Sequence, residues 1–96
     1  MTLFTAIDAA WMVPHLAQTA IWTDKHQIER PLVQIDVEYL SNILRFLEAH
    51  ADLLVVAAGW PTKNRQDSLV WIEAAPLYQA LQAELDRKLG KKGARR

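Results

Sequence analysis

Apolar residues recur at helical spacing through the middle of the chain, and this pattern predicts its clearest helix. The repeat follows Asp36, whose carboxylate is a suitable N-cap because it can accept hydrogen bonds from the free amides of a first turn. One face of this helix carries Val37, Leu40, Ile43, Leu44, Leu47, Ala51 and Leu54. Residues 53–58 are apolar all round, which predicts burial on most sides; alternatively, Asp52 caps a separate short helix there. Gly59 and Pro61 predict that the helical region ends there.

Two further helical runs follow a polar loop over residues 61–66. Asp67 or Ser68 is the expected cap of a run over residues 69–74, and Pro76 predicts a break near Ala75. Proline is favoured at the first position of a helix, so the last helix is expected over residues 76–89, with Gly90 as its stop. Its inner side would carry Leu77, Leu81, Leu85 and Leu89.

The first third of the chain is less regular. Residues 5–8 resemble a capping box and predict a helix to about Val13, which Pro14 breaks or kinks. Residues 21–23 and 31–35 are rich in strand formers and flank a polar segment, which favours a short antiparallel hairpin around residues 21–35. The sequence therefore predicts a mainly α fold: a small domain of three to four helices, with the choice between helix and hairpin in this first third left open.

Composition adds a reason to expect association. The 96 residues suffice for one domain, expected over residues 1–86, with residues 87–96 as the end of the last helix and a basic tail. Hydrophobic residues make up 51% of the chain and include four tryptophans, a large apolar load for a small interior. The interpretation is a non-enzymatic accessory module that binds a protein partner or itself, in the second case as a homodimer. The expected contact residues are Trp22, Trp60, Leu53 and Val56. In the alternative interpretation, all four tryptophans fill the core.

Charge is distributed unevenly along the chain. The net charge is zero, but residues 1–86 hold all eleven acids and five of the eleven cations, a net charge of −6. The other cations are Arg87, Lys88, Lys91, Lys92, Arg95 and Arg96. This tail could contact phosphates, so weak nucleic-acid binding is the alternative function. No aromatic residue follows Tyr78, so the tail lacks a platform on which bases could stack.

Motifs for catalysis are missing from the sequence. Its three glycines form no phosphate-binding loop, and neither of its two serines lies in a nucleophile elbow. Without cysteine there can be no disulfide and no thiolate zinc site. A small enzyme would need the fold to gather at least two of His15, His26 and His50 in one concave pocket with a carboxylate, since no two of them stand at ligand spacing. We expect no catalytic residue, no cofactor and no metal.

The sequence also indicates where in the cell the protein resides. The N-terminal residues carry no Lys or Arg and do not read as a signal peptide. The longest apolar run, residues 53–60, is far shorter than the roughly 20 residues that span a bilayer. A cytoplasmic protein without a membrane partner is therefore expected.

Two stretches carry a resemblance to small accessory proteins of phages and prophages. Some of these proteins have a W-T strand, a turn, a second strand and a helix with a His-Leu-x-Asn core. This chain is similar to them in Trp22-Thr23-Asp24, a polar turn, Ile35-Asp36 and then residues 38–48. Tyr39 stands here where that histidine lies. Residues 69–77 resemble small uncharacterised proteins of actinobacterial phages. The resemblance implies a phage-encoded, non-enzymatic accessory protein, and it carries over no functional residue.

Overall fold

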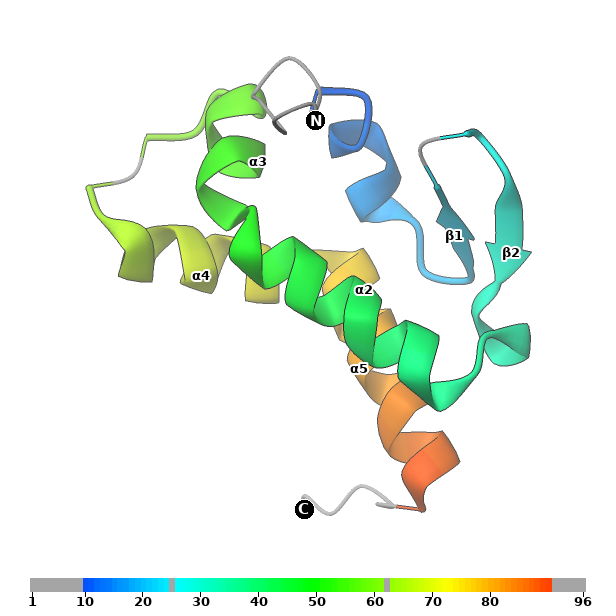
Figure 1. The fold of residues 1–96 in the computed structure, drawn as a ribbon. Coiled ribbons are helices and arrows are strands. Elements are labelled where there is room, and N and C mark those ends of the chain that lie inside the picture. The colour runs from blue at the N-terminus through cyan, green and yellow to red at the C-terminus, as the bar shows by residue number, and fades with distance from the viewer. Residues whose placement is uncertain (1–9, 25, 62, 91–96) are drawn as a thin grey trace, which may run out of the picture.

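The computed structural model describes residues 10–24, 26–61 and 63–90. Their elements are the 3₁₀ helix η1 (Val13–Ala17), strands β1 (Ile21–Thr23) and β2 (Glu29–Pro31), the 3₁₀ helix η2 (Leu32–Gln34), and helices α2 (Val37–Ala49), α3 (Ala51–Ala57), α4 (Arg65–Glu73) and α5 (Pro76–Leu89). The prediction of a small, mainly helical domain with a short antiparallel hairpin is confirmed (Figure 1). Of the helix expected to about Val13, residues 5–9 lie outside the described residues; Trp11 and Met12 form a turn, and Val13 begins η1.

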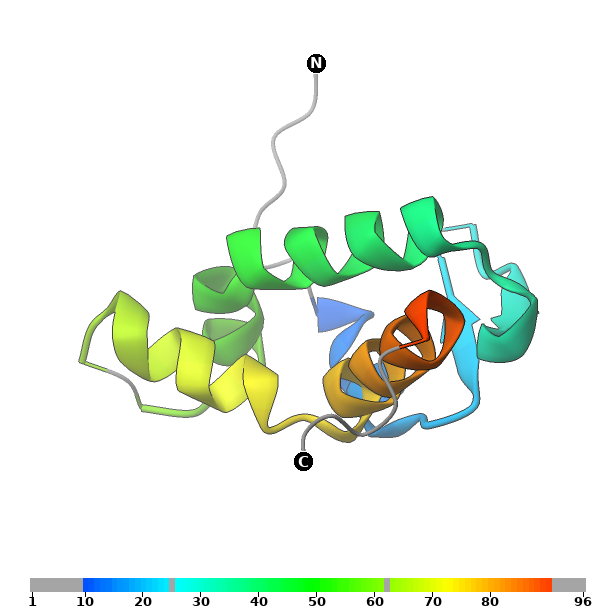
Figure 2. The same ribbon diagram turned by 90° about the horizontal axis from the view of Figure 1, so that it is seen from below.

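Helix α2 forms one layer of the domain and crosses over α5 (Figures 1 and 2). It begins as the sequence predicts, because the Asp36 carboxylate accepts a hydrogen bond from the Tyr39 amide at 2.8 Å. Its inner face buries Leu40, Ile43, Leu44 and Leu47. Opposite this face lie α5 and η1, which also pack on each other and enclose the core (Figure 2).

The long helical pattern is divided at His50. Its backbone leaves helical geometry (φ −109°, ψ 16°), and its Nδ1 lies 2.9 Å from the carbonyl oxygen of Phe46. The separate short helix, α3, was the alternative prediction, but Asp52 lies in its first turn and does not cap it. Val56, on α3, is 62% exposed, so the expectation that residues 53–58 are buried on most sides is wrong at this position.

Helix α4 begins earlier than predicted. Asn64, and neither Asp67 nor Ser68, is its N-cap: the Asn64 side chain accepts from the Asp67 amide at 3.0 Å. The Asp67 carboxylate in turn accepts from the Lys63 amide, also at 3.0 Å. This reciprocal pairing satisfies two amides and extends the helix to Arg65.

The last helix matches its prediction from end to end. Ala75 breaks from α4, Pro76 opens α5, and Gly90 ends it with a left-handed conformation (φ 78°) that glycine adopts without strain. Leu77, Leu81 and Leu85 are buried as expected. Leu89 is 49% exposed, so the prediction that it lies on the inner side of the helix was wrong.

The hairpin forms with a different second strand from the one predicted. The Asp24 carboxylate accepts from the amides of His26 and Ile28, and Gln27 takes a left-handed conformation (φ 65°). This tight turn brings Glu29 opposite Thr23, so β2 covers Glu29–Pro31. Residues 32–34, expected to be strand, turn into η2, which places Leu32 in the core.

The core draws on almost every described element. Its fully buried side chains include Met12, Leu40, Leu47, Leu54, Ile72, Leu77 and Leu81. Trp11 and Trp71 are half-buried and pack against the core, so the alternative in which all four tryptophans fill it does not hold for them. None of the described helices is both long enough and apolar enough to cross a membrane.

Candidate functional site

Trp60 is held outward by the end of α3. Gly59 has a left-handed conformation (φ 79°), its amide donates to the Val56 carbonyl, and the Trp60 amide donates to the Val55 carbonyl at 3.1 Å. This pair of bonds is the Schellman motif, which fixes the chain just beyond a helix. Pro61 restricts the backbone on the other side. The indole is nevertheless 61% exposed, so a large apolar ring projects from a backbone that is already ordered.

A shallow apolar groove lies beside Trp60, with a volume of about 370 Å³. It runs between η1, the end of α3 and the α4–α5 connection. The described residues that line it include no charged one: Val13, Leu16, Ala17, Ala58, Trp60, Trp71, Ala74, Ala75 and Pro76. We call this groove together with the exposed side chain of Val56 the Trp60 surface.

The four predicted contact residues do not form one surface. Val56 and Trp60 are exposed at the same end of α3, and Leu53 is half-buried against the core. Trp22 is only 6% exposed and belongs to the core, so its place among the contact residues needs correction. Two of the tryptophans thus have opposite environments: Trp22 is enclosed, and Trp60 is open to a partner.

A second hollow, of about 420 Å³, opens between α2, β1 and the residues that precede η1. Aromatic side chains dominate its lining, so we call it the aromatic cleft. The lining residues are Trp11, Met12, Trp22, Asp24, Tyr39, Asn42, Ile43 and Phe46. Its volume falls in the range of small-molecule sites, which are mostly apolar with a few placed polar groups.

Polar contacts fix one wall of the aromatic cleft. Trp22 Nε1 donates to the Tyr39 hydroxyl oxygen at 3.2 Å, and the guanidinium of Arg30 lies 5.6 Å from the centre of the Tyr39 ring. Arg30 also pairs with Asp24 at 2.8 Å. This guanidinium, aided by the amides of Ile28 and His26, lowers the pKa of the Asp24 carboxyl. The Asp24 carboxylate therefore stays ionised, and the Arg30 guanidinium in the same wall neutralises its charge.

The histidines are dispersed over the fold. His15 lies in η1 with its ring edge-on to Trp11, His26 is in the exposed hairpin turn, and His50 stacks on Phe46 at the α2–α3 junction. Within residues 10–24, 26–61 and 63–90, no group of three or more His, Asp or Glu side chains could hold a metal ion. The gathering of histidines that the enzyme hypothesis required is not found among these residues.

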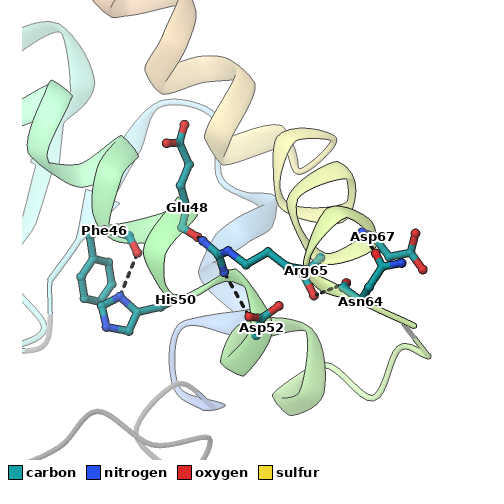
Figure 3. A network of polar contacts seen from close by, with 8 residues as sticks. Phe46, Glu48, His50, Asp52, Asn64, Arg65 and Asp67 are labelled. Atoms are coloured by element: carbon teal, nitrogen blue, oxygen red, sulfur yellow. Dashed lines mark hydrogen bonds and ion pairs between the residues drawn. The ribbon is translucent and has the colours of Figure 1, made fainter.

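Arg65 joins three helices at the α2–α3 junction (Figure 3). Its guanidinium donates to the Glu48 carbonyl oxygen at 2.6 Å and to the Asp52 carboxylate at 3.1 Å. A hydrogen bond from the Ser68 side chain lowers the pKa of the Asp52 carboxyl, and the hydrogen bond from Arg65 lowers it further. The sequence did not single out Arg65, because only the fold brings α4 against the end of α2.

Glu48 extends this junction to α5. The Tyr78 hydroxyl donates to its carboxylate at 2.5 Å. Burial, together with this negatively charged acceptor, raises the pKa of Tyr78 well above its ordinary value, so the hydroxyl keeps its proton. The junction is thus a structural brace, since each of its polar groups already has a protein partner.

Part of the basic tail is also engaged. Arg87 pairs with Glu84, while Lys88 Nζ lies 3.4 Å from that carboxylate and donates to the Val33 carbonyl at 2.7 Å. The two cations lower the pKa of Glu84. Lys88 ties α5 to η2, whereas the Arg87 side chain is 61% exposed and pairs with Glu84 on its own helix. The remaining tail cations, Lys91, Lys92, Arg95 and Arg96, lie outside the described residues.

Comparison with known proteins finds no family model that matches the chain, and no curated protein and no solved structure that is similar to it. The functional argument therefore rests on the Trp60 surface and the aromatic cleft themselves.

Proposed function

We propose that this chain is a non-enzymatic interaction module that associates through the Trp60 surface, and that its partner is a second copy of itself. The observation that carries the proposal is an indole that is 61% exposed on an ordered helix cap beside an uncharged groove. Tryptophan is enriched among the residues that dominate binding energy at interfaces, because it buries a large area with few rotatable bonds.

The size of the exposed ring sets the scale of the effect. A tryptophan buries up to about 250 Å², so an indole that is 61% exposed leaves about 150 Å² to cover. At about 25 cal/mol per Å² this area is worth about 4 kcal/mol at most. The backbone around Gly59 is already fixed, so little ordering entropy opposes its burial.

A second copy fits this surface for two reasons. Trp60 and the groove lie on the same face, so a two-fold axis near Trp60 lets each ring enter the groove of the other copy. The part of the lining that the structure describes carries no charge, so these residues of two identical surfaces meet without like-charge repulsion. A self-complementary contact of this kind gives a closed dimer.

Sedimentation equilibrium over a wide concentration range tests the proposal. Wild type should dimerise reversibly, and Trp60→Ala should weaken the dimer at least tenfold. Val33→Ala is the matched control, because Val33 is 60% exposed on η2 and lies outside the Trp60 surface; its dissociation constant should stay within twofold of wild type. A chain that stays monomeric at millimolar concentration, or equal weakening by both substitutions, contradicts the proposal.

Nucleic-acid binding through the tail is less well supported. Arg87 and Lys88 are already paired with Glu84. The phage resemblance stays an expectation from the sequence.

A further inference from the structure

The aromatic cleft has features that the proposed association does not use. Its walls come from three separate parts of the chain: Trp11 and Met12 before η1, Trp22 and Asp24 at β1, and the face of α2 that carries Tyr39, Asn42, Ile43 and Phe46. It shares no lining residue with the groove beside Trp60. The cleft is therefore a separate candidate site.

The size of the cleft limits what it could hold. A cavity of about 150 Å³ lined by apolar side chains is large enough to bind benzene. The aromatic cleft measures about 420 Å³ and is open on one side, so a ligand of two fused rings fits with room for solvent at the mouth. Its aromatic walls favour a flat ligand, since stacked and edge-to-face ring contacts add to the burial of apolar area.

The charges around the cleft favour a neutral ligand. Among the described residues that line the cleft, Asp24 contributes the one ionised group, and its carboxylate is paired with Arg30 at 2.8 Å. A ligand anion would meet this carboxylate, and the guanidinium beside it, that of Arg30, is already paired with it. A ligand cation would lose its hydration in a mostly apolar cleft, and the guanidinium already takes the role of counter-ion.

Tyr39 supplies one specific contact. Its hydroxyl oxygen accepts from Trp22 Nε1 at 3.2 Å, which orients the group, and within the described part of the chain its own proton is donated to no protein acceptor. A ligand acceptor in the cleft would complete this chain of hydrogen bonds. We infer that the aromatic cleft binds a neutral, flat ligand of two fused aromatic rings that presents a hydrogen-bond acceptor to Tyr39.

Quinoline is a suitable probe, because it is neutral at pH 7 and has one ring nitrogen that accepts. Titrated into the full chain and followed by the indole resonances, it should bind saturably at one site and shift Trp11 and Trp22. Tyr39→Phe should weaken quinoline about fivefold, the effect of one hydrogen bond, and leave naphthalene unchanged. The anion 2-naphthoate should bind wild type at least tenfold more weakly than quinoline.

Asn42→Trp tests the site without touching the buried core, because Asn42 is exposed at the edge of the cleft on α2. The larger ring should fill the cleft and weaken quinoline at least tenfold. Gln66→Trp, at an exposed position on α4, is the control and should bind quinoline like wild type.

Three results would overturn the inference. The first is that quinoline does not bind saturably to the full chain. The second is that quinoline shifts the resonances of Trp60 and Trp71 in place of those of Trp11 and Trp22. The third is that Asn42→Trp and Gln66→Trp lose quinoline affinity equally. Equal affinity of wild type for naphthalene and quinoline would overturn the acceptor contact with Tyr39.

Discussion

Replacing Arg65 with methionine should destabilise the domain by about 1.5–2.5 kcal/mol. Methionine and arginine have similar helix propensities, so the change removes the polar contacts while α4 keeps its intrinsic stability. The guanidinium donates to a backbone carbonyl at the end of α2, at 2.6 Å, and to the Asp52 carboxylate at 3.1 Å (Figure 3).

The magnitude follows from the two contacts and their exposure. A hydrogen bond from a charged donor is worth about 1.5–3 kcal/mol, and the side chain of Arg65 is 47% exposed, so the lower end applies. The ion pair with Asp52 adds less than about 1 kcal/mol, because both side chains are about half exposed to solvent. For a domain of this size, about 1 kcal/mol corresponds to about 4–8 °C in Tm.

Urea unfolding followed by circular dichroism measures the loss. Arg45→Met is the matched control, since Arg45 is exposed on α2 and makes no ion pair among the described residues; it should change the free energy of unfolding by less than about 0.5 kcal/mol. Arg65→Lys should retain part of the stability, because an ammonium can reach one acceptor but not both. Equal losses for Arg65→Met and Arg45→Met would refute the account of this junction.

Further substitutions and conditions test other parts of the fold. Leu47→Ala, at a fully buried position on α2, should cost about 2–5 kcal/mol in urea unfolding, and a loss below 1 kcal/mol would contradict the place of α2 in the core. Gly59→Ala should lower Tm by the equivalent of about 1 kcal/mol, because the φ of 79° disfavours a side chain although the space is open; no loss would argue against the helix cap. Stability should also fall as the pH drops below about 5, because carboxyls with lowered pKa values stabilise the fold only while ionised. A pH titration of Tm checks this, and a Tm that is unchanged down to pH 2 would contradict the pairings of Asp24, Asp52 and Glu84.

The sequence predicted elements whose signals are local. Asp36, Pro76 and Gly90 mark the ends of α2 and α5 because each acts on its own first or last turn. It placed β2 wrongly because the side chain of Asp24 closes a tighter turn than the strand-forming composition suggested. The sequence also indicated Asp67 or Ser68 as the cap of α4, whereas Asn64, another residue type that can cap, occupies that position.

The candidate sites depend on contacts between distant segments, which the pattern along the chain does not reveal. Trp22 and Trp60 have similar sequence contexts, next to predicted loops, yet one is buried under Tyr39 and the other is exposed beyond Gly59. The aromatic cleft needs three segments to meet, so no single stretch of sequence indicated it. Gly59 and Pro61 predicted that a helix ends beside Trp60, but not that its ring is exposed.

The most direct test of association through the Trp60 surface uses a spin label. The chain has no cysteine, so Lys63→Cys provides a unique labelling site on the exposed loop near Trp60. Labelled, isotope-free chain is mixed with unlabelled, ¹⁵N-enriched chain, and intermolecular broadening of the indole resonances is measured. The account predicts broadening of Trp60 and Trp71 and little effect on Trp22. The absence of intermolecular broadening, or broadening centred on Trp22, would contradict it.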